Sequence, residues 1–64
     1  MATWRGPDGI QVEVIMLNRA PLYKITQRVN GRRYFLAYSS DVDGLLPWVD
    51  LGDLVEVIPF PATG

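Results

Sequence analysis

The sequence predicts a small α+β domain, an antiparallel β-meander with one short helical segment, that occupies residues 1–64 as a single unit. Several short runs alternate between apolar and polar residues, with the period of two that a half-buried strand requires. An Asn-Gly pair separates two of these runs, and apolar residues at helical spacing follow them. The expected strands lie at about residues 2–5, 10–17, 22–29, 32–38 and 53–58, and the helical segment lies at about 41–50.

A tight turn at Gly6-Pro7-Asp8-Gly9 joins the first two strands. Proline presets φ at the start of a turn, aspartate hydrogen-bonds its own backbone, and glycine supplies a positive φ. With a bulge at Gly9, Trp4 lies opposite Val12 in the hairpin. The strand at 10–17 then directs its even-numbered residues to one face and its odd-numbered residues to the other.

The next hairpin turns at Asn18-Arg19-Ala20-Pro21, a cluster of turn-forming residues that separates two alternating runs. With four residues in this loop, Met16 faces Tyr23 and Val14 faces Ile25. This register is an expectation that depends on the length of the loop, because a change of loop length shifts every pair.

Asn30-Gly31 predicts the third hairpin, since a type I′ turn needs a positive φ at both central residues. The two-residue loop pairs Arg28 with Arg33 and Tyr23 with Tyr38. The three turns agree on one core face, and this agreement supports the meander. The residues expected on that face are Trp4, Val12, Val14, Met16, Tyr23, Ile25, Leu36 and Tyr38.

The segment at 41–50 begins with signals for a helix and contains signals against one. Ser39 and Ser40 are suitable N-caps, and acidic residues suit the positive end of a helix. However, Pro47 would cost about 3 kcal/mol inside an α-helix. The alternative fold is therefore a small SH3-like β-barrel in which this segment forms a 3₁₀ turn.

The composition excludes several kinds of chemistry. The chain has no cysteine and no histidine, so it lacks disulfides, thiolate metal ligands and the commonest general base. No run of apolar residues approaches the roughly 20 that a membrane-spanning helix needs. We therefore expect a soluble cytoplasmic protein without enzymatic activity, catalytic residues, metal or other cofactor, membrane contact or small-molecule substrate.

The charges are segregated along the chain although the net charge is only −1. Residues 1–38 hold all six cations and two anions, a net +4, whereas residues 39–64 hold five anions and no cation. Three arginines flank the Asn-Gly turn, and two aromatic residues follow them. Cations around an exposed aromatic side chain suit phosphate contacts and base stacking. The nucleic-acid contacts expected under this interpretation are Lys24, Arg28, Asn30, Arg32 and Arg33.

The face opposite the expected core is apolar at one end, and a single helical segment covers only one side of a sheet. An exposed apolar patch usually marks an interface, and tryptophan is a favoured anchor in interfaces. We therefore interpret the chain as a non-catalytic binding module, a small regulatory or accessory protein that acts as a homo-oligomer or through one protein partner. The alternative is a DNA-binding accessory protein that uses the 28–33 hairpin. The expected interaction face comprises Ile15, Leu17, Leu22, Phe35 and Trp48.

Overall fold

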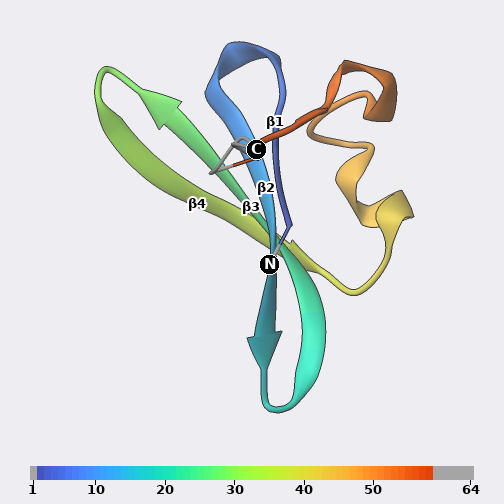
Figure 1. The fold of residues 1–64 in the computed structure, drawn as a ribbon. Helices are drawn as coiled ribbons and strands as arrows, with labels where there is room; N and C mark the ends of the chain where they lie inside the picture. The colour runs from blue at the N-terminus through green and yellow to red at the C-terminus, as the bar shows by residue number, and fades with distance from the viewer. Residues whose placement is uncertain (1, 59–64) are drawn as a thin grey trace, which may run out of the picture.

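The computed structural model describes residues 2–58 and shows one twisted antiparallel sheet with short 3₁₀ turns (Figure 1). The sheet order is β4-β3-β2-β1-β5, so β1 to β4 form the predicted antiparallel meander, whereas β5 pairs with β1 instead of continuing it from β4. Over the described residues the sheet is open, with β4 and β5 as its edges, so it differs from the closed barrel of the alternative. The absence of an α-helix there makes the domain mostly β rather than α+β. The strands are β1 (Thr3–Arg5), β2 (Ile10–Leu17), β3 (Ala20–Val29), β4 (Arg32–Ser39) and β5 (Val55–Glu56), and the 3₁₀ turns are η1 (Pro7–Gly9), η2 (Val42–Leu45) and η3 (Leu51–Asp53).

The β1–β2 connection folds as the sequence predicts. Trp4 pairs with Val12, and the Gly6 N–H donates to the Ile10 carbonyl at 2.9 Å. Gly9 has a φ of +79°, which a residue with a side chain rarely adopts. A Cβ at Gly9 would also collide with the backbone carbonyl of Arg28. The turn is therefore docked directly against β3, and only glycine permits this approach.

The β2–β3 hairpin differs from the expected register by two residues. Its loop is the two-residue turn Asn18-Arg19, in which both φ angles are positive, and Pro21 belongs to β3. Pro21 pairs with Met16 of β2, close to the turn. The pairing of β3 with β4 ends before this residue, so no strand on that side needs the N–H that proline lacks. Val14 therefore faces Tyr23 rather than Ile25. Because the shift is an even number of residues, each side chain keeps the face that was predicted for it.

The β3–β4 turn is confirmed, but β4 contains a bulge that the sequence analysis did not predict. Asn30 and Gly31 have positive φ angles, and Arg28 pairs with Arg33. The register then shifts, because Thr26 pairs with Phe35 while its neighbour Ile25 pairs with Ala37. Leu36 is the extra residue in β4.

The bulge reverses the face of every β4 residue beyond it. Tyr38 pairs with Lys24 on the face opposite the core, so the expected pairing of Tyr38 with Tyr23 is wrong. Leu36 and Ala37 both pack against the core despite being consecutive. A regular strand would have directed one of these two side chains away from the core. The extra residue therefore provides more core contact at the cost of exposing Tyr38.

The segment after β4 forms 3₁₀ turns instead of the predicted helix at 41–50. The Asp41 side chain caps η2 by accepting a hydrogen bond from the Gly44 N–H at 3.0 Å, a role that the sequence analysis gave to serine. Pro47 follows η2 and separates it from η3. Of the four apolar residues at helical spacing, Leu45 and Val49 enter the core, whereas Val42 and Leu46 are exposed.

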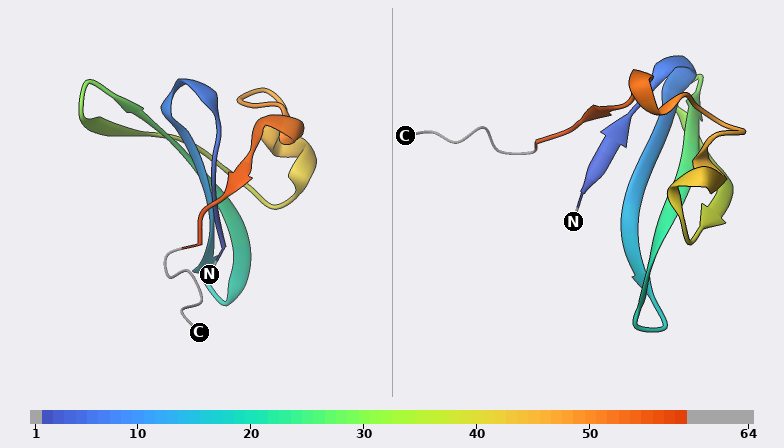
Figure 2. Two further views of the ribbon diagram at one scale, coloured as in Figure 1. Left: turned by 45° about the horizontal axis from the view of Figure 1, so that its top comes forward. Right: turned by 90° about the vertical axis from the view of Figure 1, so that its right-hand side faces the viewer.

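The core lies between one face of the sheet and the segment that runs from η2 to η3 (Figure 2). β5 is shorter than the expected strand at 53–58 and pairs with β1, so it returns the chain to the opposite edge from β4. No helix within residues 2–58 has the length and apolar character needed to cross a bilayer. The five buried apolar residues of the core are Ile10, Val12, Ile25, Leu45 and Val49.

The first prediction concerns the attachment of η2 to the sheet. Leu45 is 2% exposed and its neighbour Leu46 is 52% exposed. Leu45→Ala should lower the free energy of unfolding by about 2–4 kcal/mol, because it leaves a cavity in a small core. Leu46→Ala should change it by less than about 0.5 kcal/mol. Urea unfolding of both variants measures the difference, and equal effects would show that η2 is not part of the core.

The second prediction concerns the β3–β4 turn. Gly31 has a φ of +81°, and the position that a Cβ would occupy is open space. Gly31→Val should therefore destabilise the fold by about 1–2 kcal/mol through backbone strain alone. Gly52 is the matched control because its Cβ position is also open, whereas its φ lies outside the left-handed region. If thermal unfolding shows the same loss for Gly52→Val, the type I′ turn is not the cause.

Candidate functional site

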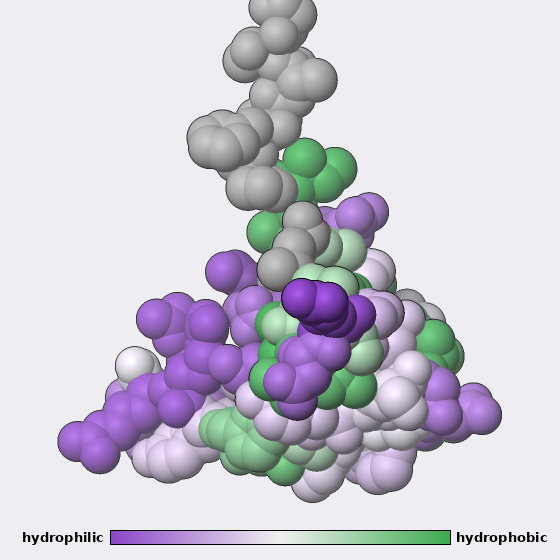
Figure 3. Space-filling view, turned by 90° about the horizontal axis from the view of Figure 1, so that it is seen from below, coloured by the Kyte–Doolittle hydropathy of each residue, from purple (hydrophilic) through white to green (hydrophobic). Residues whose placement is uncertain are grey.

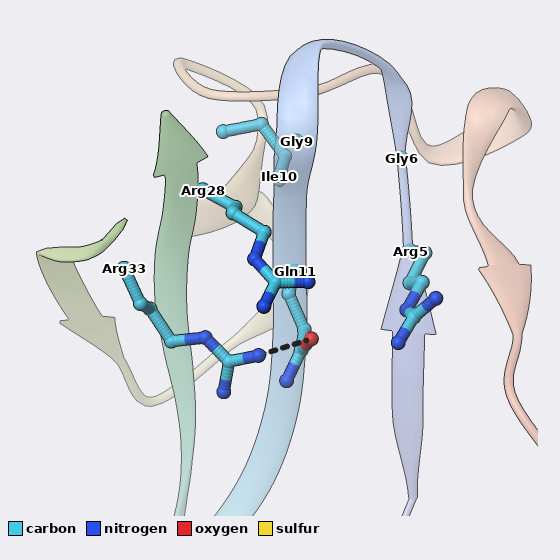
Figure 4. Close-up of a pocket in the computed structure, with 7 residues that line it drawn as sticks. All are labelled: Arg5, Gly6, Gly9, Ile10, Gln11, Arg28 and Arg33. Atoms are coloured by element: carbon cyan, nitrogen blue, oxygen red, sulfur yellow. Dashed lines mark hydrogen bonds between the residues drawn. The ribbon is translucent and has the colours of Figure 1, made fainter. Parts of the chain in front are cut away.

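A basic pocket opens on the face of the sheet opposite the core, here called the outer face (Figure 4). Its cavity volume is about 130 Å³. Three strands each contribute one arginine, Arg5 from β1, Arg28 from β3 and Arg33 from β4. Among the described residues, its lining includes no carboxylate. The remaining lining residues are Gly6, Gly9, Ile10 and Gln11.

The strand registers explain why these arginines share a pocket. Arg5 lies across from Gln11 in the β1–β2 pair, and Arg28 lies across from Arg33 in the β3–β4 pair. Gln11 pairs in turn with Thr26, two residues before Arg28 on the same face of β3. The docking of η1 against β3 brings the two glycines of the β1–β2 connection to the upper rim of the pocket (Figure 4).

Gln11 occupies the centre of this arrangement. The Nη2 atom of Arg33 donates to its Oε1 atom at 3.2 Å. The head groups of Arg28 and Arg33 both extend toward Gln11, and Arg5 lies on its other side (Figure 4). Within residues 2–58, Arg5 and Arg28 make no side-chain hydrogen bond. Two of the three guanidinium groups therefore have free donors.

Thr26 shows how closely the outer face is packed beside the pocket. Its side chain lies between its cross-strand partners Gln11 and Phe35 and is only 2% exposed. Within the described chain, its Oγ1 atom has no hydrogen-bond partner. The neighbouring side chains on the outer face therefore cover the middle of the sheet, although residues 2–58 form no second layer over it.

The structure brings together only some of the residues predicted to contact nucleic acid. Arg28 and Arg33 line the pocket, and Lys24 lies on the same face, paired with Glu13 and Tyr38. Asn30 is in the turn. Arg32 pairs with Val29, so its side chain leaves the sheet on the opposite face.

The sequence analysis missed Arg5 and Gln11, although a signal for them was present. The predicted pairing of Trp4 with Val12 also places Arg5 opposite Gln11. The predicted registers also place Gln11 opposite Arg28 and Arg28 opposite Arg33, so the turns already indicated that these residues lie together, although in the structure Gln11 pairs with Thr26.

The residues of the expected interaction face divide between two places. Ile15 pairs with Leu22, and both are half-buried on the outer face toward the β2–β3 turn. Leu17 and Phe35 are exposed on the same face. Trp48 is also exposed, but it belongs to the segment that covers the core side of the sheet. Seen from the side of the β2–β3 turn, apolar areas alternate with hydrophilic ones (Figure 3).

The bulge in β4 adds an aromatic pair to the outer face. Phe35 and Tyr38 have ring centroids 4.8 Å apart with an interplanar angle of 57°, a favourable tilted geometry. Both side chains remain about half exposed. A regular strand would have placed residues three apart on opposite faces, so this pair exists only because of the bulge.

A second cavity, of about 200 Å³, lies on the core side between the sheet and the 3₁₀ turns. Its lining is almost entirely apolar and includes Trp4, Leu45 and Leu54, which also belong to the core or pack against it. This cavity therefore reflects incomplete coverage of the core by a short segment.

No protein-family model, curated protein or solved structure matches this chain. Its function is therefore inferred from the chemistry of its own surfaces.

Proposed function

We propose that the chain is a non-catalytic binding module, a small cytoplasmic regulatory or accessory protein that acts through protein–protein contacts, including contacts between copies of itself. One observation carries this proposal, an apolar end of the outer face that residues 2–58 leave uncovered. Leu17 is exposed there beside half-buried Ile15 and Leu22, and the segment from η2 to η3 lies on the other side of the sheet. Exposed Phe35 lies farther along the same face, beside Thr26. Apolar groups gathered in this way favour burial by a partner surface.

The proposed contact uses the face of the sheet rather than its edge. β4 is an eight-residue edge strand with one unpaired side, which could in principle accept another strand. However, two arginines occupy the start of β4 and a bulge distorts it at Leu36. Charges and bulges are the features that discourage pairing at an edge. The segregated charge of the sequence also suits a head-to-tail contact, because each copy has a basic part and an acidic part.

The third prediction tests self-association. Sedimentation velocity at micromolar concentrations should show a species larger than the monomer. Leu17→Gln should weaken this association by about tenfold or more, because it removes an apolar side chain from the interface. Val29→Gln is the matched control, since Val29 is 42% exposed, Leu17 is 41% exposed, and each is the last residue of a strand before a type I′ turn.

A wild-type chain that remains monomeric through the concentration series would contradict self-association. Equal weakening by Leu17→Gln and Val29→Gln would contradict the assignment of the interface to the outer face, because the Val29 side chain lies on the other face.

A second candidate function is nucleic-acid binding, and the aromatic pair specifically favours it. Phe35 and Tyr38 lie on the same face as Lys24, Arg28 and Arg33. Aromatic rings stack on bases, and the neighbouring cations contact phosphates. The bulge thus makes this surface more suited to single-stranded nucleic acid than a β4 strand without a bulge would be.

The fourth prediction follows from this candidate. Fluorescence anisotropy with short duplex and single-stranded DNA should show an affinity that falls with salt, with a log–log slope of about −0.9 per phosphate neutralised. The double substitution Arg28→Ala/Arg33→Ala should flatten the slope by about two units between about 50 and 200 mM salt. Arg19→Ala is the control because Arg19 lies in the β2–β3 turn, at the other end of β3. The protein-contact proposal instead expects no binding at about 150 mM salt.

A further inference from the structure

We propose that the pocket of Arg5, Arg28 and Arg33 is a binding site for a phosphate group in its dianionic form. This site does not depend on the proposed protein contact, because it lies at the η1 end of the outer face rather than at the β2–β3 turn. It is supported by a cavity of about 130 Å³, three convergent cations and free hydrogen-bond donors.

The arrangement of charges around the pocket is unfavourable for the protein alone. Arg28 and Arg33 are direct cross-strand partners, and like charges in that position destabilise a sheet. Arg5 adds a third positive charge, and among the described residues the lining supplies no carboxylate to balance them. A bound anion would turn this repulsion into three charge-assisted contacts.

The geometry favours phosphate over a carboxylate. The guanidinium groups come from β1, β3 and β4 and reach the pocket from separate directions. A carboxylate presents two oxygens in one plane, whereas a phosphate presents several oxygens around a tetrahedron and accepts bidentate contacts from more than one arginine.

Gln11 has a defined role in this site. Its Oε1 atom accepts the hydrogen bond from Arg33, which orients that guanidinium and leaves the Gln11 amide N–H groups free to donate. The close approach of Gly9 to the Arg28 backbone holds η1 against β3 and fixes the rim of the pocket. The site is therefore partly ordered before any ligand arrives.

The phosphate site differs from the nucleic-acid surface described above. It includes Arg5 and excludes Arg32, which lies on the opposite face. A backbone phosphodiester carries one negative charge, whereas a terminal phosphate carries up to two above its second pKa of about 6. Three cations favour the more highly charged group, which could be inorganic phosphate or the terminal phosphate of a small molecule.

The fifth prediction is tested by NMR titration of the full chain with sodium phosphate at constant ionic strength. The wild type should saturate in the millimolar range or below at about pH 8, and its affinity should fall by about threefold or more at about pH 5.5, because inorganic phosphate is mostly a dianion at the higher pH and almost entirely a monoanion at the lower pH. The charged residues of the lining are Arg5, Arg28 and Arg33, whereas the carboxylates of η1 and β2, Asp8 and Glu13, lie outside the lining. Sulfate, which remains a dianion, is the control for other effects of pH.

Two neighbouring arginines provide matched variants. Arg33→Gln should weaken phosphate binding by about tenfold or more, because it removes a charged donor from the site. Arg32→Gln makes the same change of charge one residue away on the other face and should weaken binding less than about twofold. Arg5→Gln should resemble Arg33→Gln, although Arg5 is distant in the sequence. Amide spectra that remain well dispersed show that each variant is folded.

Several results would overturn the proposal. One is the absence of saturable chemical-shift changes at the amides of Arg5, Gln11 and Arg33 when the wild type is titrated with phosphate. Another is equal weakening by Arg32→Gln and Arg33→Gln, which would reduce the effect to net charge. A third is identical pH dependence for phosphate and sulfate, which would remove the preference for the phosphate dianion. A terminally phosphorylated dinucleotide and its unphosphorylated counterpart distinguish a terminal phosphate from a backbone phosphodiester. If the site takes a terminal phosphate, it should bind only the phosphorylated dinucleotide.

Discussion

The packing of Leu45 and Val49 against Ile10, Val12 and Ile25 is the interaction on which the rest of this structure depends. These are the only buried apolar residues in the described chain, and they join the segment after β4 to one face of the sheet. A domain of this size has a stability of only about 3–10 kcal/mol, so the loss of one such contact removes a large share of it. The same packing decides which face of the sheet is covered and leaves the outer face available.

The bulge at Leu36 changes which β4 side chains lie on each face of the sheet. It allows Leu36 and Ala37 to pack against the core together, and it directs Tyr38 outward beside Phe35. Small domains gain much of their stability from each additional apolar contact, because they bury a limited fraction of their surface. The aromatic pair of the outer face is thus a consequence of packing on the inner face, and the nucleic-acid candidate uses it directly.

The basic pocket combines strict backbone requirements with an unfavourable charge arrangement. Gly9 must approach the Arg28 carbonyl, and Asp8 adopts a φ of 60° to permit the turn. Positive φ at a residue other than glycine costs free energy, as does the direct pairing of Arg28 with Arg33. Features that lower stability and converge on one concave place are characteristic of binding sites, where a ligand offsets their cost.

Local patterns in the sequence determined much of the fold. Asn30-Gly31 predicted its hairpin and the pairing of Arg28 with Arg33, because only residues that tolerate positive φ occupy a type I′ turn. The turn at 6–9 predicted the pairing of Trp4 with Val12 for a similar reason. The helical spacing of Val42, Leu45, Leu46 and Val49 indicated a segment that packs on the sheet, but only Leu45 and Val49 are buried, and the backbone there is 3₁₀ rather than α-helical.

Tertiary structure alone decided the remainder. The β2–β3 loop has two residues because Pro21 lies where no strand needs its N–H, a condition that depends on where β4 ends. The bulge at Leu36 follows from the shape of the core, which no local pattern in β4 encodes. The pocket requires Arg5, Gln11, Arg28 and Arg33 to meet across four strands, so its formation depends on every register between them. Local propensity acts over a few residues, whereas these features depend on contacts between residues far apart in the chain.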